Sequence, residues 1–530
     1  MDIDMDKYHA ELYRRQRRVK QGREARRDAG VYDALPSVPA LFRHKDVLIT
    51  GASGFLGRVL VEKLLRCCPD LGTVYMLLRP KKGVAPADRV NAIVDVPLFE
   101  QVRREHPAAL GKLVPVAGDC SELGLGLSAE DRGLLQRRVA FVFHGAASVR
   151  FDDPLQKAVL LNTRGSRELV ELCRGMERLE ALVHVSTAYT NSNQWPIEER
   201  LYPTELDWRD AIHIASNPSI AGVLDKLGHK FLGFHPNTYT FSKALSEQVM
   251  GEAAASLPVI IVRPAIVVGA VNEPLAGWLD NVNSPAAMWM AVNKGVLRAC
   301  ELYHPDSLQD YVPVDLVTKA TILAAWARAT EQDLDTGDGA VPVVNVAITD
   351  VHPVTGKMML DIFRGSGRQD APYSNAIRYP CLFTYRIPFV IQIYNFFYHL
   401  LFGATVDLVL RLANQKPMLM KVYRRIELTT RALSPFTRRH FKFDTHKFWK
   451  LQLVMHPDDE VRFDYGIDKF HPVVDGANQV EGILRYALGE EFDREKGLRH
   501  INRLFWLEAA FYGLLVAVLL YYFQPFSHLW

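Results

Sequence analysis

The segment between residues 46 and 66 limits the possible folds more than any other part of the sequence. Residues 46–51 form a short apolar run that ends in glycine, and the apolar side chains of residues 58–66 recur with helical spacing. The turn Gly51-Ala-Ser-Gly54-Phe-Leu-Gly57 joins the two. Glycines there let the backbone approach a pyrophosphate, whose charge the helix N-terminus favours. We therefore predict a dinucleotide-binding turn with contacts from Thr50, Gly51, Ser53, Gly54, Phe55, Leu56 and Gly57.

Further short apolar runs alternate with helical patterns, at residues 73–78, 113–117, 139–143, 181–185 and 259–262. Strands that alternate with helices form a parallel sheet covered on both faces. We therefore predict an α/β, doubly wound Rossmann domain over residues 40–350. Since 530 residues exceed a single compact core, we expect a second, mainly helical domain over residues 351–490.

The residues after each strand indicate how a dinucleotide would be held. Nicotinamide-dinucleotide (NAD) enzymes usually carry an acidic residue about 20 positions past the glycines, at the end of the second strand. This chain has Arg79 there, followed by Lys81 and Lys82. A cation suits a 2′-phosphate, so we predict NADPH, held by Arg79 with Lys82 assisting. The spacing also points to Asp119 at the adenine, to Ala146 and Ala147 along the cofactor, and to Pro264 and Ile266 at the nicotinamide carboxamide.

Tyr239 and Lys243 form a YxxxK pattern, which places both side chains on one face of a helix. A neighbouring ammonium would lower the tyrosine pKa and aid proton transfer, and Lys243 could also bind the nicotinamide ribose. Upstream, Ser186 and Thr187 end a strand, where a hydroxyl can hydrogen-bond a substrate oxygen. We predict Tyr239, Lys243 and Thr187 as catalytic, with Ser186 as the second choice for the hydroxyl. A surface tyrosine and lysine pair is the alternative.

The chain approaches its C-terminus with an apolar segment, residues 504–523, which carries one charge, Glu508. A helix of about 20 residues spans a bilayer, and aromatic residues flank both ends of the segment. Basic residues precede it, namely Arg494, Lys496, Arg499 and Arg503. We therefore predict a single-pass transmembrane helix with the catalytic domains on the cytosolic side. A buried amphipathic helix is the alternative.

Two other segments have open interpretations. Residues 1–39 form a basic N-terminal arm, which could be a solvated, disordered or helical arm or could contact anionic lipid. The apolar residues 387–412 could line an acyl tunnel, lie on a membrane or form a buried helix pair.

Composition excludes few function classes. The six cysteines include no CxxC pair and no zinc-like spacing, which is typical of a reducing compartment and predicts no metal site. The net charge of +3 is nearly neutral for this length, and we expect no nucleic-acid partner.

Five motifs together resemble the alcohol-forming fatty acyl-CoA reductases, extended short-chain dehydrogenases, in their insect-like form. They are Ile49-Thr-Gly-Ala-Ser-Gly-Phe-Leu-Gly57, His184-Val-Ser-Thr-Ala-Tyr189, Pro236-Asn-Thr-Tyr-Thr-Phe-Ser-Lys-Ala244, Gly277-Trp-Leu-Asp-Asn281 and Asp310-Tyr-Val-Pro-Val-Asp315. The resemblance implies that residues 40–350 form a male-sterility-like domain and that the region after 350 helps bind the acyl chain.

The resemblance further implies two NADPH-dependent reductions of a long-chain acyl-CoA, through an aldehyde to an alcohol, with release of CoA. Tyr239 would protonate the carbonyl oxygen, Lys243 would tune Tyr239, and Thr187 would orient the carbonyl. The implied location is the peroxisomal or endoplasmic reticulum membrane. The residues leave two alternatives open, a sterol or sugar-nucleotide oxidoreductase and a membrane-tethered NADPH-binding scaffold.

Overall fold

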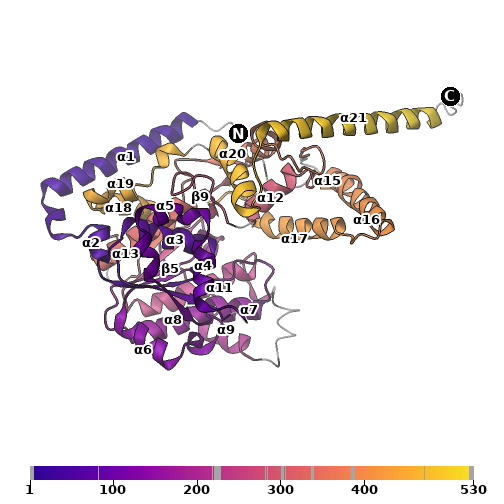
Figure 1. Ribbon diagram of the computed structural model, residues 1–530. Coiled ribbons are helices and arrows are strands. Elements are labelled where there is room, and N and C mark those ends of the chain that lie inside the picture. The colour runs from indigo at the N-terminus through magenta and orange to yellow at the C-terminus, as the bar shows by residue number, and fades with distance from the viewer. Residues whose placement is uncertain are drawn as a thin grey trace. The chain divides into compact units, whose positions relative to one another are not determined.

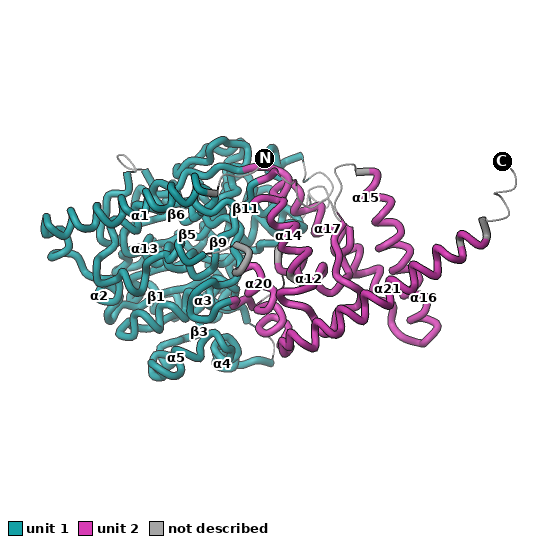
Figure 2. The backbone as a smooth tube through the Cα atoms, turned by 90° about the horizontal axis from the view of Figure 1, so that it is seen from above, with its two compact units in different colours: residues 1–276, 308–354, 441–470 teal, residues 277–307, 355–440, 471–530 magenta. Residues whose placement is uncertain are grey.

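The computed structural model divides the chain into two compact units (Figure 2). Unit 1 contains residues 1–276, 308–354 and 441–470, and unit 2 contains residues 277–307, 355–440 and 471–530. The structure describes residues 5–80, 83–217, 219, 228, 230–280, 282, 284–299, 304, 306–335, 340–383, 388–470 and 472–523. The sequence suggested domains that are continuous along the chain. Each unit is instead assembled from three chain segments, which alternate with those of the other unit.

Unit 1 is built around a parallel sheet of seven strands in the order β10-β6-β5-β4-β1-β2-β3 (Figure 1). The strands are β1 (Asp46–Thr50), β2 (Val74–Leu78), β3 (Leu113–Ala117), β4 (Val139–His144), β5 (Ala181–Val185), β6 (Val259–Pro264) and β10 (Val343–Val346). Every residue of β1, β2, β4, β6 and the edge strand β10 is buried, as expected for a parallel sheet covered on both faces. The strand order reverses between β1 and β4, where a doubly wound sheet opens a crevice at its carboxyl edge. The predicted Rossmann domain is confirmed.

Helices cover both faces of this sheet. Helices α8 (Gly165–Cys173) and α11 (Thr238–Ala253) share one apolar core with Leu48, Val142 and Leu182. On the opposite face Phe42, from α2 (Val38–Phe42), packs on Phe141 with ring centroids 4.4 Å apart. Helix α13 (Val314–Ala329) contacts α2, α3 (Phe55–Cys67), β5 and β6 on that side.

The other helices of unit 1 are shorter or peripheral. They are α4 (Pro86–Val94), α5 (Glu100–Glu105), α6 (Ala129–Arg138), α7 (Leu155–Ala158), α9 (Trp208–Ala215), α18 (His446–Val454) and α19 (Glu460–Phe463). A single π-helical stretch, Val159–Arg164, precedes α8. Beside the main sheet, the short strands β7 (Ile266–Val268) and β9 (Tyr311–Pro313) pair in parallel.

The basic N-terminal arm is a helix, α1 (Met5–Asp28), which packs along α18. The guanidinium of Arg15 lies 2.5 Å from the Asp350 carboxylate, and Arg23 donates to the Gln452 carbonyl at 2.7 Å. These two arginines therefore bind other parts of unit 1. If the arm contacts anionic lipid, the contact would be made by exposed residues such as Arg17 and Arg18.

Unit 2 is mainly helical, as predicted. Its helices are α12 (Ser284–Asn293), α14 (Gly356–Gly365), α15 (Pro388–Asn395), α16 (Phe402–Leu412), α17 (Leu419–Thr437), α20 (Pro472–Gly482) and α21 (Arg494–Phe523). Gly277 has φ +75°, and a Cβ on it would lie 2.7 Å from the Asn478 carbonyl oxygen. The adjacent Trp278 is buried against Tyr486 with ring centroids 5.3 Å apart. In the motif at residues 277–281, Gly277 and Trp278 therefore contribute to the packing of unit 2.

Two helical stretches among the described residues are long and apolar enough to cross a membrane, by length and composition. They are Phe389–Leu412, with a mean hydropathy of 1.4, and Arg494–Val518, with the same value. The second lies in α21 and overlaps the predicted span 504–523. Large side chains along α21 are exposed, including Trp506, Leu507, Phe511 and Leu514, so α21 is a long apolar helix with an unburied face.

Candidate active site

The glycine turn between β1 and α3 has the shape that a phosphate-binding turn needs. Gly51 has φ +79°, and a Cβ on it would lie 2.8 Å from the Ala146 amide nitrogen. A Cβ on Gly57 would lie 2.2 Å from the Gly51 carbonyl oxygen, so only glycine lets α3 begin this close to the turn. Gly54 is the N-cap of α3, and no described side chain caps the first-turn amides. Those amides fit the pyrophosphate of a dinucleotide.

Thr50 joins the ends of β1 and β4 beneath this turn. Its hydroxyl accepts from the Ala146 amide at 3.2 Å and lies 2.7 Å from His144 Nδ1. Burial lowers the pKa of His144 to about 3, so its imidazole is neutral. Because the Ser166 hydroxyl donates to the Asn162 carbonyl at 2.7 Å, His144 Nε2 donates to Ser166 Oγ at 3.1 Å, and the Thr50 hydroxyl donates to Nδ1. Since the Thr50 side chain is committed to this network, it supports the turn from below.

Arg79 follows β2 and its side chain is exposed. Arg89, on α4, donates its guanidinium to the Arg79 carbonyl oxygen, which brings a second cation to the end of β2. Sequence reasoning missed Arg89, because it lies ten residues downstream on a separate helix. Lys82 and its neighbour Lys81 lie outside the described residues.

The structure gives the other predicted cofactor contacts, Asp119, Pro264 and Ile266, different roles. One carboxylate oxygen of Asp119 accepts from the Ser121 amide at 2.9 Å and from its hydroxyl at 2.8 Å, which shapes the turn after β3. The Ile266 amide donates to the Asp310 carbonyl at 3.0 Å, in the β7–β9 pairing. Because Pro264 has no N–H and the Ile266 amide is engaged, only carbonyl groups of these two residues could meet a carboxamide.

Tyr239 and Lys243 lie on α11, which begins at the N-cap Asn237. The Thr187 hydroxyl, which follows β5, lies close enough to the Tyr239 phenol to influence its pKa, and it donates to the Pro264 carbonyl at 3.5 Å. Burial raises the pKa of Tyr239 to about 12, and the nearby Thr187 hydroxyl opposes that rise. The structure thus brings together the two hydroxyls that the sequence selected.

Lys243 is arranged differently from the expectation. Its ammonium donates to the Val185 carbonyl at 2.6 Å, and the Tyr239 pKa is raised rather than lowered. Burial lowers the pKa of Lys243 to about 8, and the nearby Glu247 carboxylate opposes this. Glu247 is itself held by buried Arg263, whose Nη2 lies 2.6 Å from its carboxylate. Lys243 therefore sits at the carboxyl end of β5, where a ribose could meet it.

Ser186 is not part of this pair. Its amide donates to the Val262 carbonyl at 2.7 Å, and its buried hydroxyl has no partner among the described residues. Of the two neighbouring hydroxyls, Thr187 is the one that meets Tyr239.

Asn162 has a structural role. Its side-chain oxygen accepts from the Ser148 amide at 2.8 Å, and its amide group donates to Ser242 Oγ at 2.9 Å. It thereby connects the loop after β4 to α11, between Tyr239 and Lys243. Phe151, from the same loop, lies over Tyr239 with ring centroids 6.0 Å apart.

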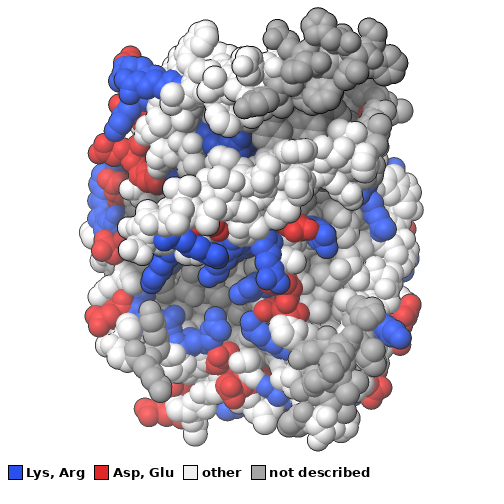
Figure 3. All heavy atoms as spheres, turned by 90° about the vertical axis from the view of Figure 1, so that its right-hand side faces the viewer, with Lys and Arg blue, Asp and Glu red and all other residues white. Residues whose placement is uncertain are grey.

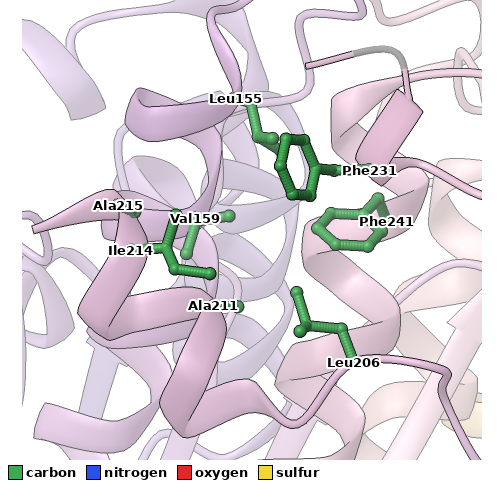
Figure 4. Close-up of a pocket in the computed structure, with 8 residues that line it drawn as sticks. All are labelled: Leu155, Val159, Leu206, Ala211, Ile214, Ala215, Phe231 and Phe241. Atoms are coloured by element: carbon green, nitrogen blue, oxygen red, sulfur yellow. The ribbon is translucent and has the colours of Figure 1, made fainter. Parts of the chain in front are cut away.

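A small apolar hollow lies beside α11 (Figure 4). Phe231 and Phe241 face Leu155, Val159 and Ile214 across it. Phe241 lies two residues from both Tyr239 and Lys243, which is about 200° around a helix. The hollow is therefore on the opposite side of α11 from the catalytic pair and does not serve it.

Comparison with known proteins agrees with this arrangement. Residues 49–321 match an NAD-binding family model described as male sterility protein, and residues 398–490 match a second model with that description. The chain is 33% identical to fatty acyl-CoA reductase 1 of Rattus norvegicus over 486 residues, which covers 92% of this chain and 93% of that protein. It is 33% identical to fatty acyl-CoA reductase 2 of Homo sapiens, covering 89% and 91%.

Solved structures share the fold at lower identity. The terminal R domain of the myxalamid PKS-NRPS pathway superposes with a TM-score of 0.55 at 19% identity, covering 85% of this chain and 93% of that one. The R domain of a nonribosomal peptide synthetase from Mycobacterium tuberculosis gives 0.54 at 20% identity, covering 86% and 94%.

Proposed function

Since the chain belongs to the fatty acyl-CoA reductase family, we propose that it reduces a long-chain fatty acyl-CoA to a fatty alcohol. The first reduction breaks the thioester C–S bond, releases CoA and leaves an aldehyde. The second converts the aldehyde into the primary alcohol. The placement of the Tyr239 phenol near the Thr187 hydroxyl, at the sheet edge that carries the glycine turn, is the observation that supports this proposal best.

The residues divide the chemistry as follows. NADPH supplies the hydride of each reduction when it is bound. Tyr239, with a pKa raised to about 12, keeps its proton at neutral pH and donates it to the carbonyl oxygen as charge develops there. Thr187 holds the phenol in place and adds a hydroxyl beside the same oxygen. Lys243, which is a cation below its pKa of about 8, holds the ribose hydroxyls.

We assign NADPH rather than NADH on the basis of Arg79 and Arg89. Both are cations at the end of β2, where a dinucleotide places its adenosine ribose. The family match covers an NAD(P)-binding domain in general, so the preference for the 2′-phosphate rests on these two side chains.

The membrane location is the third part of the proposal. Helix α21 would anchor the chain in a single pass with both units on the cytosolic side, in the peroxisomal or endoplasmic reticulum membrane. Protease protection of the full chain in intact cells, together with organelle markers, tests both the sidedness and the organelle.

The substrate class is tested with detergent-purified full-length protein and NADPH. We expect palmitoyl-CoA or stearoyl-CoA to give the matching alcohol, identified by gas chromatography. Aldehyde alone would make the protein a one-step reductase. Turnover of a sterol or sugar nucleotide without acyl-CoA turnover would refute the proposal, as would NADPH binding without turnover of any carbonyl.

A further inference from the structure

The segment 389–412 of unit 2 is apolar yet largely uncovered. Large hydrophobic side chains along it are exposed, among them Phe389 at 67%, Leu401 at 49% and Leu412 at 79%. The others are Ile393, Phe396, Phe397, Leu400, Leu408 and Val409. A contiguous exposed apolar surface of this kind is a site for a partner or a membrane, so the buried helix pair considered from the sequence is not what forms.

Two polar side chains inside the segment, Asp407 and His399, bond within unit 2. The Asp407 carboxylate accepts from the amides of Met418, Leu419 and Met420, at 3.0, 2.8 and 3.0 Å. His399 Nε2 accepts from the Arg298 amide at 3.0 Å. The Asp407 and His399 side chains are therefore turned inward, and the outer surface is mainly apolar, with Gln392, Thr405 and Arg411 as its exposed polar residues.

The following helix, α17, returns along α16. A Cβ on Gly403 would lie 2.8 Å from the Tyr423 ring, and Tyr423 stacks on His399 with ring centroids 4.8 Å apart. Leu419 and Tyr423 form a small core with Val296, against which Phe402 packs. A helix held this closely to its neighbour could cross a bilayer only if α17 entered it too.

Helix α17 is too polar for that. Residues 411–439 contain eight basic residues and one acidic residue, Glu427. Lys421, Arg424, Arg425 and Arg431 are exposed on α17. Figure 3 shows one face of the molecule, on which lysine and arginine side chains lie next to uncharged residues. Apolar and basic surfaces side by side match the boundary between acyl chains and anionic headgroups.

The C-terminal helix belongs to the same part of unit 2. Glu508 of α21 lies 2.8 Å from Arg298 Nη2, and the backbone amide of Arg298 bonds to His399. The rings of Tyr398 and Tyr512 lie 6.4 Å apart. The exposed apolar segment is therefore continuous with the candidate membrane anchor.

We propose that residues 389–412 lie in the plane of an anionic membrane surface as a second contact, beside α21, and do not span it. The apolar side chains enter the acyl boundary, and the basic residues of α17 bind lipid phosphates. This contact would hold unit 2 against the phase into which long acyl chains partition, independently of whether the reductase chemistry is as proposed.

The test measures the depth of three positions in the full chain. Phe389→Cys, Leu401→Cys and Leu412→Cys, each labelled with an NBD fluorophore, are placed in lipid nanodiscs whose lipids carry a spin-label quencher near the headgroup or near the chain end. The cysteines that the structure describes are buried, and the unsubstituted protein, labelled in parallel, corrects for background. Glu427→Cys, on the exposed basic helix, is the matched control.

For an in-plane helix we expect all three positions to be quenched more by the shallow label than by the deep one, and Glu427→Cys, whose helix meets the headgroups, to be quenched by the shallow label alone. Deep quenching at Leu401 with shallow quenching at both ends would mean a span and would overturn the proposal. No quenching at any of the three would mean that protein or water covers the segment, which overturns it equally.

A second experiment tests whether the contact depends on anionic lipid. Quenching should increase when phosphatidylserine replaces part of the phosphatidylcholine, and the pair Arg424→Gln with Arg425→Gln should remove at least half of that increase. The matched pair Arg17→Gln with Arg18→Gln, two exposed arginines of α1, should leave it unchanged. An increase that survives the α17 substitutions and falls with the α1 pair would assign the lipid contact to the N-terminal arm instead.

Discussion

The substitution Gly57→Ala separates the effect of the glycine turn on cofactor binding from its effect on folding. The added Cβ would lie 2.2 Å from the Gly51 carbonyl oxygen and 2.8 Å from Ala52 Cα, both backbone atoms that cannot rotate away. Ordinary van der Waals contact begins at 3.4 Å, and contacts of 3.0–3.4 Å are already tight, so the start of α3 must move away from the turn by about 1 Å. Alanine in a helix is favoured over glycine by about 1 kcal/mol, whereas overpacking costs about 1–3 kcal/mol.

These terms nearly cancel for folding, and we expect the free energy of unfolding to fall by no more than about 2 kcal/mol. Cofactor binding has no such compensation, because the displaced first-turn amides are the ones that would meet the pyrophosphate. A misplacement of about 1 Å can cost on the order of 100-fold, and we expect the Kd for NADPH to rise by about that factor.

The assay is NADPH fluorescence titration beside thermal unfolding of the same preparation. Gly111→Ala is the control, because nothing lies within 4 Å of a Cβ there, and its Kd should equal that of the unsubstituted protein. A folded Gly57→Ala protein that binds NADPH normally would refute the reasoning about the turn.

The remaining predictions concern the catalytic pair and the second cation. Thr187→Val keeps the shape but removes the hydroxyl that meets Tyr239, so kcat/KM should fall about 10²–10³-fold with the Kd for NADPH unchanged; an equal loss in both would indicate a structural role. Arg79→Gln should lower kcat/KM for NADPH about tenfold, corresponding to about 1.4 kcal/mol for one charged contact, with little change for NADH; equal losses would remove Arg79 from the phosphate site. Lys243, with a pKa lowered to about 8 by burial, loses its charge as pH rises through that value, so kcat/KM should decline above about pH 8; Lys243→Arg, which stays cationic, should flatten that limb, and an unchanged limb would assign it to another group.

Much of unit 1 could be predicted because its strands are buried on both faces. Continuous apolar runs bounded by polar residues mark such strands, and the predicted runs 139–143 and 181–185 lie in β4 and β5. The run at Val343–Val346 was not singled out, since four residues carry little pattern. The assembly of unit 1 from separate chain segments could not be predicted, because it depends on long-range packing. One such contact is the Asn345 side chain donating to the Asp444 carbonyl.

In the candidate site, too, some features could be predicted from the sequence and others could not. Spacing alone placed Tyr239 and Lys243 on one helix and Thr187 at a strand end, since strand and helix geometry fix these positions. The choice between Ser186 and Thr187 followed the sequence preference and is supported by the contact with Tyr239. Spacing could not show that Lys243 bonds to the Val185 carbonyl, that the Ile266 amide is engaged, or that Arg89 approaches Arg79. Each depends on how separate loops meet. The insect-like character inferred from the motifs stays a prediction.

The most direct test of the central claim compares the full-length protein with Tyr239→Phe, each given NADPH and palmitoyl-CoA, with the alcohol quantified by gas chromatography. The phenylalanine keeps the ring that lies beside Phe151 and removes only the proton donor. We expect hexadecanol from the unsubstituted protein and none from the variant, with the same Kd for NADPH in both. Alcohol formed by the variant at the unsubstituted rate would contradict the account.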